Sequence, residues 1–167
     1  MFKVNDFVVY GISGVCQITD IEKDSYINNE VLEYYVLKPV FSDNMTIKLP
    51  VHSSKVLIRK TMSKEEVLSL IESIPKQKTL WLEDNRERSE YFKAALKTGK
   101  SEELVKVVKT IYLEKEEKAA VGRKLSKTDE DIFKTAEKQL NEEFGLALGI
   151  APDEVIPYIL EHIPSNE

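Results

Sequence analysis

One predicted helix, residues 80–97, carries cationic and aromatic side chains of the kinds that bind nucleic acids. Three basic residues recur along it at spacings of seven and four, with Glu90 interrupting them: Arg86, Lys93 and Lys97. A neighbouring stripe, at spacings of four, three and four, holds Trp81, Asn85, Arg88 and Phe92. Basic groups neutralise phosphates, and a large planar ring can wedge against bases in a minor groove. On residue type alone we favour the alternative, in which the two aromatic rings anchor a core while the charges are solvated.

No other set of side chains predicts chemistry. His52 and His162 have neither a nearby cysteine nor a second histidine four residues away, so we expect no metal site. The glycine loop at residues 11–14 lacks the lysine and the helix of a phosphate loop and is predicted to be a turn. The single Cys16 is expected to be a small buried hydrophobe. We therefore predict that the chain is not an enzyme and takes no cofactor, metal or small-molecule substrate.

Helical periodicity dominates the chain after about residue 60 and must position these side chains. Capping residues, glycines and prolines delimit helices at residues 63–74, 80–97, 101–122, 126–149 and 152–162. Ser63 and Glu66 form a predicted capping box, and Ser101 and Ser126 are predicted N-caps. His162 is expected at a helix end.

The first 60 residues instead alternate as short strands between turns. Strands are predicted at residues 6–10, 15–22, 31–40, 45–49 and 56–58, with turns at 11–14, 28–29 and 42–44. Alternation places Leu32, Tyr34 and Val36 on one face. We predict an α+β fold in which a small Tudor-like or SH3-like β-barrel, residues 1–60, precedes an all-α helical bundle domain, residues 61–167.

Composition excludes some classes of protein and location. No run of 18 apolar residues exists, so no membrane span or membrane partner is expected. The N-terminus has no apolar signal core, and with one cysteine we expect a reducing cytoplasm. The net charge of −5 divides unevenly: residues 1–60 are neutral, 61–127 carry +3 and 128–167 carry −8. Such a split can give one domain faces of opposite potential.

Several short motifs point to a known family. The head contains FKVNDFVVY at residues 2–10, Gly14-Val15, Ile21-Glu22, EYYVLKP at 33–39 and TIKLP at 46–50. The tail contains Arg88 ten residues before Thr98-Gly99, Leu125-Ser126 at a helix start, and AEKQL at 136–140. Over nearly its whole length the chain resembles the CarD/CdnL transcription regulators of bacteria.

The resemblance implies a Tudor-like head that binds a lobe of the β subunit of RNA polymerase. Lys48 occupies the position of a basic residue that faces the polymerase in this family, and Lys23 and Asp24 lie where the family has a second contact region. The resemblance also implies a helical tail that contacts promoter DNA at the upstream edge of the −10 element and stabilises the melted bubble.

For DNA, Arg88 matches an arginine of the family's DNA-contacting helix. The family's wedge tryptophan corresponds to Asn85 here, and Trp81 is expected one helical turn earlier on the same face. The predicted DNA-binding residues are therefore Arg88, Trp81, Asn85, Arg86, Lys93 and Lys97. Two interpretations stay open: a regulator that bridges polymerase and promoter DNA, and a protein-interaction adaptor whose helices bind another protein without direct DNA contact.

Overall fold

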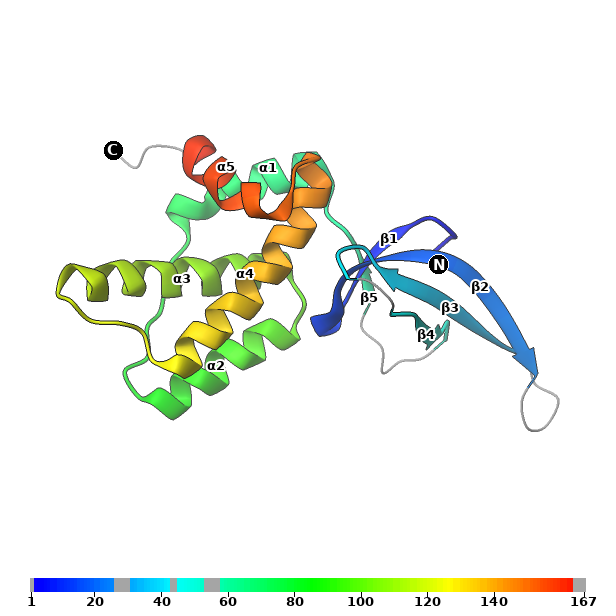
Figure 1. Cartoon of the computed structure of the whole chain (residues 1–167), viewed down its shortest axis with the longest axis horizontal. Helices are drawn as coiled ribbons and strands as arrows, with labels where there is room; N and C mark the ends of the chain where they lie inside the picture. The colour runs from blue at the N-terminus through cyan, green and yellow to red at the C-terminus, as the bar shows by residue number, and fades with distance from the viewer. Residues whose placement is uncertain (1, 26–30, 43–44, 53–57, 164–167) are drawn as a thin grey trace. The chain divides into compact units, whose positions relative to one another are not determined.

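A computed structural model describes residues 2–25, 31–42, 45–52 and 58–163 of the chain. The chain divides into two compact units, Met1–Thr61 and Met62–Glu167. The first contains the strands and the second the helices, so the predicted α+β class is confirmed (Figure 1). The predicted turn at residues 28–29 and residues 43–44 and 56–57 of other predicted elements lie outside the described residues.

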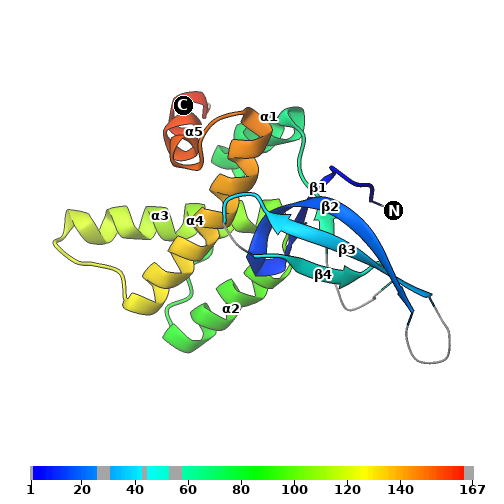
Figure 2. The same cartoon turned by 45° about the vertical axis from the view of Figure 1, so that its right-hand side comes forward.

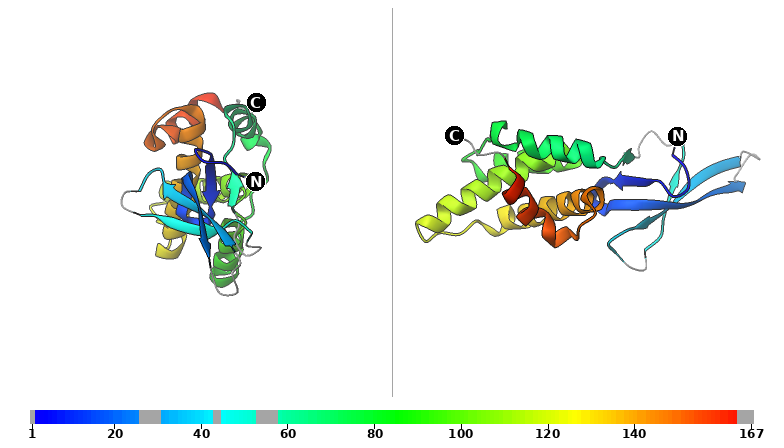
Figure 3. Two further views of the ribbon diagram at one scale, coloured as in Figure 1. Left: turned by 90° about the vertical axis from the view of Figure 1, so that its right-hand side faces the viewer. Right: turned by 90° about the horizontal axis from the view of Figure 1, so that it is seen from above.

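The first unit is built on an antiparallel sheet of five described strands. They are β1 (Phe7–Tyr10), β2 (Gly14–Ser25), β3 (Val31–Pro39), β4 (Ile47–Pro50) and β5 (Ile58–Lys60). Their order across the sheet is β4-β3-β2-β1-β5. The right-hand view in Figure 3 shows β2 and β3 running side by side, as their antiparallel pairing requires. The predicted glycine turn is a short 3₁₀ helix, η1 (Gly11–Ser13), between β1 and β2.

A shift of register in β2 decides which side chains form the core of the sheet. The pairing of β2 with β3 slips between Ile18 and Asp20, as in a β-bulge. Because side chains alternate along a strand, this extra residue lets both Ile18 and Ile21 pack on the core. Tyr35 and Leu37 of β3 belong to that core, and Cys16 is buried as predicted. Leu32 alternates with Tyr35 and Leu37 along β3 and so points to the opposite face of the sheet, where it is 40% exposed.

In the second unit, α4 (Lys127–Leu148) is the helix around which the others pack. It contacts α1 (Lys64–Ser73), α2 (Asn85–Lys97), α3 (Ser101–Ala120) and α5 (Val155–His162) (Figures 1 and 2). Short 3₁₀ helices, η3 (Ile74–Lys76) and η4 (Pro152–Glu154), follow α1 and precede α5. All five α-helices contribute to one apolar core, in which Ile111 and Phe144 are fully buried. Burial of such side chains is the main force that holds the helices together.

Helix ends follow the capping residues, with two corrections. The capping box of Ser63 and Glu66 is present, and Ser126 caps α4 as predicted. The helix predicted from residue 80 instead begins at Asn85, because the Asp84 carboxylate caps it by accepting a hydrogen bond from the Glu87 N–H at 2.9 Å. Ser101 is not an N-cap but the first residue of α3, and its buried hydroxyl donates to the Glu143 carboxylate instead.

None of the helices in the described part of the chain has the length and apolarity needed to cross a membrane. The second unit has an apolar cavity of about 540 Å³ between η3, α3, α4 and α5. It is lined mainly by aliphatic side chains, and Lys109 at its edge donates hydrogen bonds to the carbonyls of Ile74 and Gln77.

Candidate functional site

The start of α2 brings together part of the set of residues predicted to bind DNA. From Asn85 onward the helix turns about 100° per residue, so residues three or four apart share a face. Arg88, Phe92 and Ala95 lie on one such face and are buried. Phe92 packs into the helical core, which carries Arg88 to the edge of that core. A cation at this depth needs a partner, because isolated buried charge is strongly unfavourable.

Asp129 of α4 is that partner. The Arg88 Nε donates to one carboxylate oxygen at 3.1 Å and Nη2 to the other at 2.8 Å, in the bidentate geometry that suits a guanidinium. The two side chains are only 6% and 4% exposed. Asp129 is itself held by Ser126, whose hydroxyl donates to Oδ2 at 2.8 Å and accepts from the Asp129 N–H at 3.2 Å. The cap of α4 thus also orients the carboxylate.

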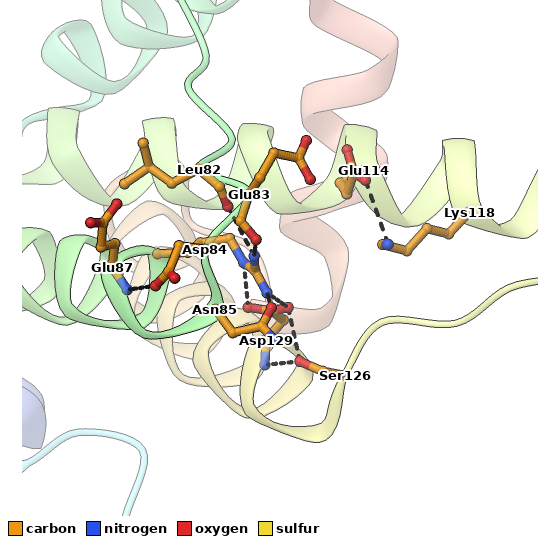
Figure 4. A network of polar contacts seen from close by, with 10 residues as sticks. Leu82, Glu83, Asp84, Asn85, Glu87, Glu114, Lys118, Ser126 and Asp129 are labelled. Atoms are coloured by element: carbon orange, nitrogen blue, oxygen red, sulfur yellow. Dashed lines mark hydrogen bonds and ion pairs between the residues drawn. The ribbon is translucent and has the colours of Figure 1, made fainter.

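The remaining N–H groups of Arg88 are all used within the second unit. Nη1 donates to the carbonyl oxygens of Leu82 at 2.9 Å and Glu83 at 3.4 Å, and Nη2 donates to Asn85 Oδ1 at 2.8 Å. Figure 4 shows Leu82, Glu83, Asn85 and Asp129 converging on one point, with Ser126 beyond the carboxylate. A guanidinium has five N–H donors, so these bonds and the pair with Asp129 occupy every one.

Trp81 lies in the segment that precedes α2, so the observed helix does not include it, although the predicted stripe did. Its ring is partly buried against the helical core, 6.1 Å from the ring of Phe92. The guanidinium carbon of Arg88 lies 4.3 Å from the centre of the indole, and Lys118 Nζ of α3 lies 5.9 Å from it. Both distances fall within the range of cation–π attraction. Trp81 is therefore a residue at the edge of the core, with cations beside it.

The three other basic residues predicted to bind DNA lie on a different face of α2. Two residues along a helix correspond to about 200°, so Arg86 points nearly opposite to Arg88. Lys93 and Lys97 follow Arg86 on its stripe, and all three residues are exposed. Arg86 Nε pairs with Glu90 at 3.3 Å, whereas no ion pair of Lys93 or Lys97 is found among the described residues.

The predicted DNA-binding set is thus divided in two. Arg86, Lys93 and Lys97 present charge to solvent. Arg88 does not, because its burial and its five occupied donors leave no N–H for a phosphate. A DNA contact of Arg88 stays a prediction; in this structure Arg88 organises the segment before α2, and Asn85 is one of its hydrogen-bond acceptors.

Two residues of this site were missed from the sequence. Asp129 lies three residues after the predicted cap Ser126, but nothing in the sequence connects it with Arg88, which is 41 residues away. Nothing in the sequence places Lys118 beside Trp81. In the structure its Nζ lies near the indole and 3.7 Å from the Glu114 carboxylate. Three exposed basic residues lie around the cap of α4, two before the helix and one at its first position: Arg123, Lys124 and Lys127.

In the first unit, the predicted polymerase-binding residues do not share one face of the sheet. Lys48 pairs in register with Val36, and its Nζ lies 2.8 Å from Glu22 Oε2 across β3. Lys23 follows Glu22 on β2, so alternation directs it to the other face, where it lies 3.7 Å from Glu33. Asp24 belongs to β2, opposite Leu32 in the ladder, and its side chain lies outside the described part of the structure.

No group of three or more His, Cys, Asp or Glu side chains in the described residues is arranged to hold a metal ion. Comparison with protein families gives one finding: residues 2–62 match the family model described as the CarD-like/TRCF RID domain. The matched segment contains all the described strands and ends within one residue of the boundary between the two units. No curated protein matches the chain.

Proposed function

Because residues 2–62 belong to the CarD-like/TRCF RID domain family, an RNA polymerase-interacting family, we propose that the first unit binds the β subunit of RNA polymerase. This domain match supports an RNA polymerase-interacting transcription factor and carries this part of the proposal. Within the sheet, Lys48 is the best placed contact, since its side chain is 55% exposed and sits on the face opposite the core. Its nearby Glu22 gives the surface both signs of charge.

Pull-down of RNA polymerase by the full chain at low salt tests this contact. Lys48→Glu should weaken capture about tenfold, because a reversed charge at an interface repels what the lysine attracted. Lys3→Glu, at another exposed lysine of the same unit, is the matched control and should bind as the wild type does. Capture that is equally strong for all three proteins would remove Lys48 from the interface, and no capture by the wild type would remove the proposal.

For the second unit we propose contact with promoter DNA near the −10 element, stabilising the open complex. The observation that supports it is the exposed stripe of Arg86, Lys93 and Lys97 on α2, close in sequence to a tryptophan held beside two cations. The lysines and arginine neutralise phosphates, and Trp81 supplies an aromatic surface. Tethering by the first unit raises the effective DNA concentration, so weak intrinsic affinity suffices for a net acidic protein.

The lifetime of the open complex on a ribosomal-type promoter measures this activity. Wild type should lengthen it, and Lys93→Glu with Lys97→Glu should abolish most of the effect and flatten its dependence on salt. The matched control is Lys134→Glu with Lys138→Glu, which reverses two exposed lysines at the same spacing on α4. If both pairs act alike, the α2 stripe is not the DNA surface. Trp81→Ala separately tests the aromatic contact.

A second candidate function is a protein-interaction adaptor without direct DNA contact. The occupied donors of Arg88 and the apolar cavity of the second unit favour it, because both are properties of a surface that is not built for phosphates. It predicts no DNA crosslinks from positions 81 and 93 when the full chain is bound to polymerase and promoter. It also predicts an unchanged open-complex lifetime.

A further inference from the structure

The segment that carries Trp81 is held next to α2 by the side chain of Arg88. Residues 77–82 form neither helix nor strand, although they lie between η3 and α2. Arg88 donates to the carbonyl oxygens of Leu82 and Glu83 and lies against the indole itself, 4.3 Å from its centre. The guanidinium therefore fixes the backbone that follows Trp81 and the ring of Trp81 at the same time.

The orientation of that guanidinium is in turn set from a different helix. When a planar guanidinium donates two parallel hydrogen bonds to one carboxylate, the carboxylate fixes the plane of the guanidinium. Asp129 provides that carboxylate from the first turn of α4, and Ser126 holds it in place. A chain of short contacts thus runs from the cap of α4, through the buried ion pair, to the indole of Trp81.

We propose that Asp129 is a positioning residue that sets the orientation of Trp81 through Arg88. Its use on DNA rests on the proposed function of the second unit, whereas the positioning itself does not. Without the carboxylate, the guanidinium loses two of its five acceptor atoms and can move away from the indole. The carbonyl oxygens of Leu82 and Glu83 then accept hydrogen bonds from water instead. Trp81 then gains freedom although the core under it is intact.

A positioning role can be separated from a merely structural one. Removing one partner of a buried ion pair destabilises a fold, but replacing both with apolar residues of similar volume is often neutral. Arg88→Met combined with Asp129→Leu should therefore keep the second unit folded while it removes the guanidinium donors to Leu82 and Glu83 and the cation beside the indole. Asp129→Asn is the milder variant, since an amide keeps the shape and loses the charge. Asp131→Asn, at an exposed aspartate of the same helix, is the matched control.

Trp81 is the only tryptophan of the chain, so its fluorescence reports this site alone. Acrylamide quenching should be at least about twofold more efficient in Asp129→Asn and in the double variant than in the wild type, and unchanged in Asp131→Asn. Far-UV circular dichroism should show that the double variant remains helical. Unchanged quenching in the double variant, or in a folded Asp129→Asn, would overturn the proposal.

Open-complex lifetime, measured on the same variants, separates this proposal from the one on which it builds. Increased quenching together with a lost effect on lifetime supports both. Increased quenching with a wild-type lifetime leaves Asp129 as the positioning residue and refutes a role of Trp81 on DNA. A lost effect on lifetime without any change in quenching refutes the positioning, and it leaves the DNA contact to be explained by the charges of the second unit.

Discussion

Substitution of Arg88 by alanine is the perturbation whose cost the structure defines best. It removes the only cation bonded to the Asp129 carboxylate among the described residues. That carboxylate is 4% exposed, so water cannot replace the guanidinium without opening the helix contact. The Ser126 hydroxyl and the backbone N–H of Asp129 itself stay in place, but they are neutral donors and do not compensate a buried charge.

The expected loss is about 3–5 kcal/mol in the free energy of unfolding of the second unit, the range for breaking a buried ion pair from one side. The acceptors left by the guanidinium at Leu82, Glu83 and Asn85 add little, because these residues reach solvent and can be hydrated. For a unit of this length, spanning Met62–Glu167, the loss corresponds to a fall in Tm of roughly 12–20 °C.

Urea unfolding followed by far-UV circular dichroism measures the loss, since the α-helices of the described residues all lie in the second unit. Arg86→Ala is the control: it removes the same side chain from the same helix, but there the guanidinium pairs with Glu90 in solvent and is 89% exposed. That substitution should cost less than about 0.5 kcal/mol. Equal costs for the two variants would refute the reasoning and return Arg88 to the set of residues available to DNA.

Three further predictions concern the positions that hold the helical unit together. Glu143→Ala should lower the free energy of unfolding, measured in urea, by about 2–4 kcal/mol. The buried Glu143 carboxylate accepts hydrogen bonds from the Ser101 hydroxyl at 2.8 Å and from the Met62 N–H at 3.0 Å. A loss below about 1 kcal/mol would contradict this. Gly145→Ala should lower Tm, since its new Cβ would lie 2.9 Å from the carbonyl oxygen of Ile150; a rise in Tm would mean that helix propensity outweighs the contact. Ser63→Ala should cost about 1 kcal/mol in urea by removing a capping box, and no shift in the midpoint would show that α1 is held by packing alone.

Local signals in the sequence predicted most of the fold. A helix begins where a side chain satisfies backbone N–H groups a few residues away, as Ser63 does for α1 and Ser126 for α4. The predicted start of α2 at residue 80 was wrong, although Asp84 with Glu87 three residues later is itself a capping signature in the sequence. The phase of the sheet core was harder, since a bulge in β2 changes which residues face inward.

The candidate site could be predicted only as a set of residue types. Spacing along α2 correctly separates the stripe of Lys93 and Lys97 from the stripe of Arg88 and Phe92. The aromatic rings favour the second stripe for the core, but residue type and spacing cannot show whether Arg88 is buried beside Phe92 or turned to solvent. That choice depends on Asp129, a tertiary partner with no local signature.

The energy of the buried ion pair between Arg88 and Asp129 also determines which cations of this unit can bind DNA phosphates. To reach a phosphate, Arg88 would first have to leave Asp129, at a cost of about 3–5 kcal/mol. A new hydrogen bond to a charged group contributes only about 1.5–3 kcal/mol. The exchange is unfavourable, and the bonds to Leu82 and Glu83 would be lost as well. Lys93 and Lys97 have no such bond to break, since no ion pair of theirs is found among the described residues. A DNA contact of this unit is therefore expected to draw its charge from the exposed stripe, with Arg88 acting only through the tryptophan that it holds.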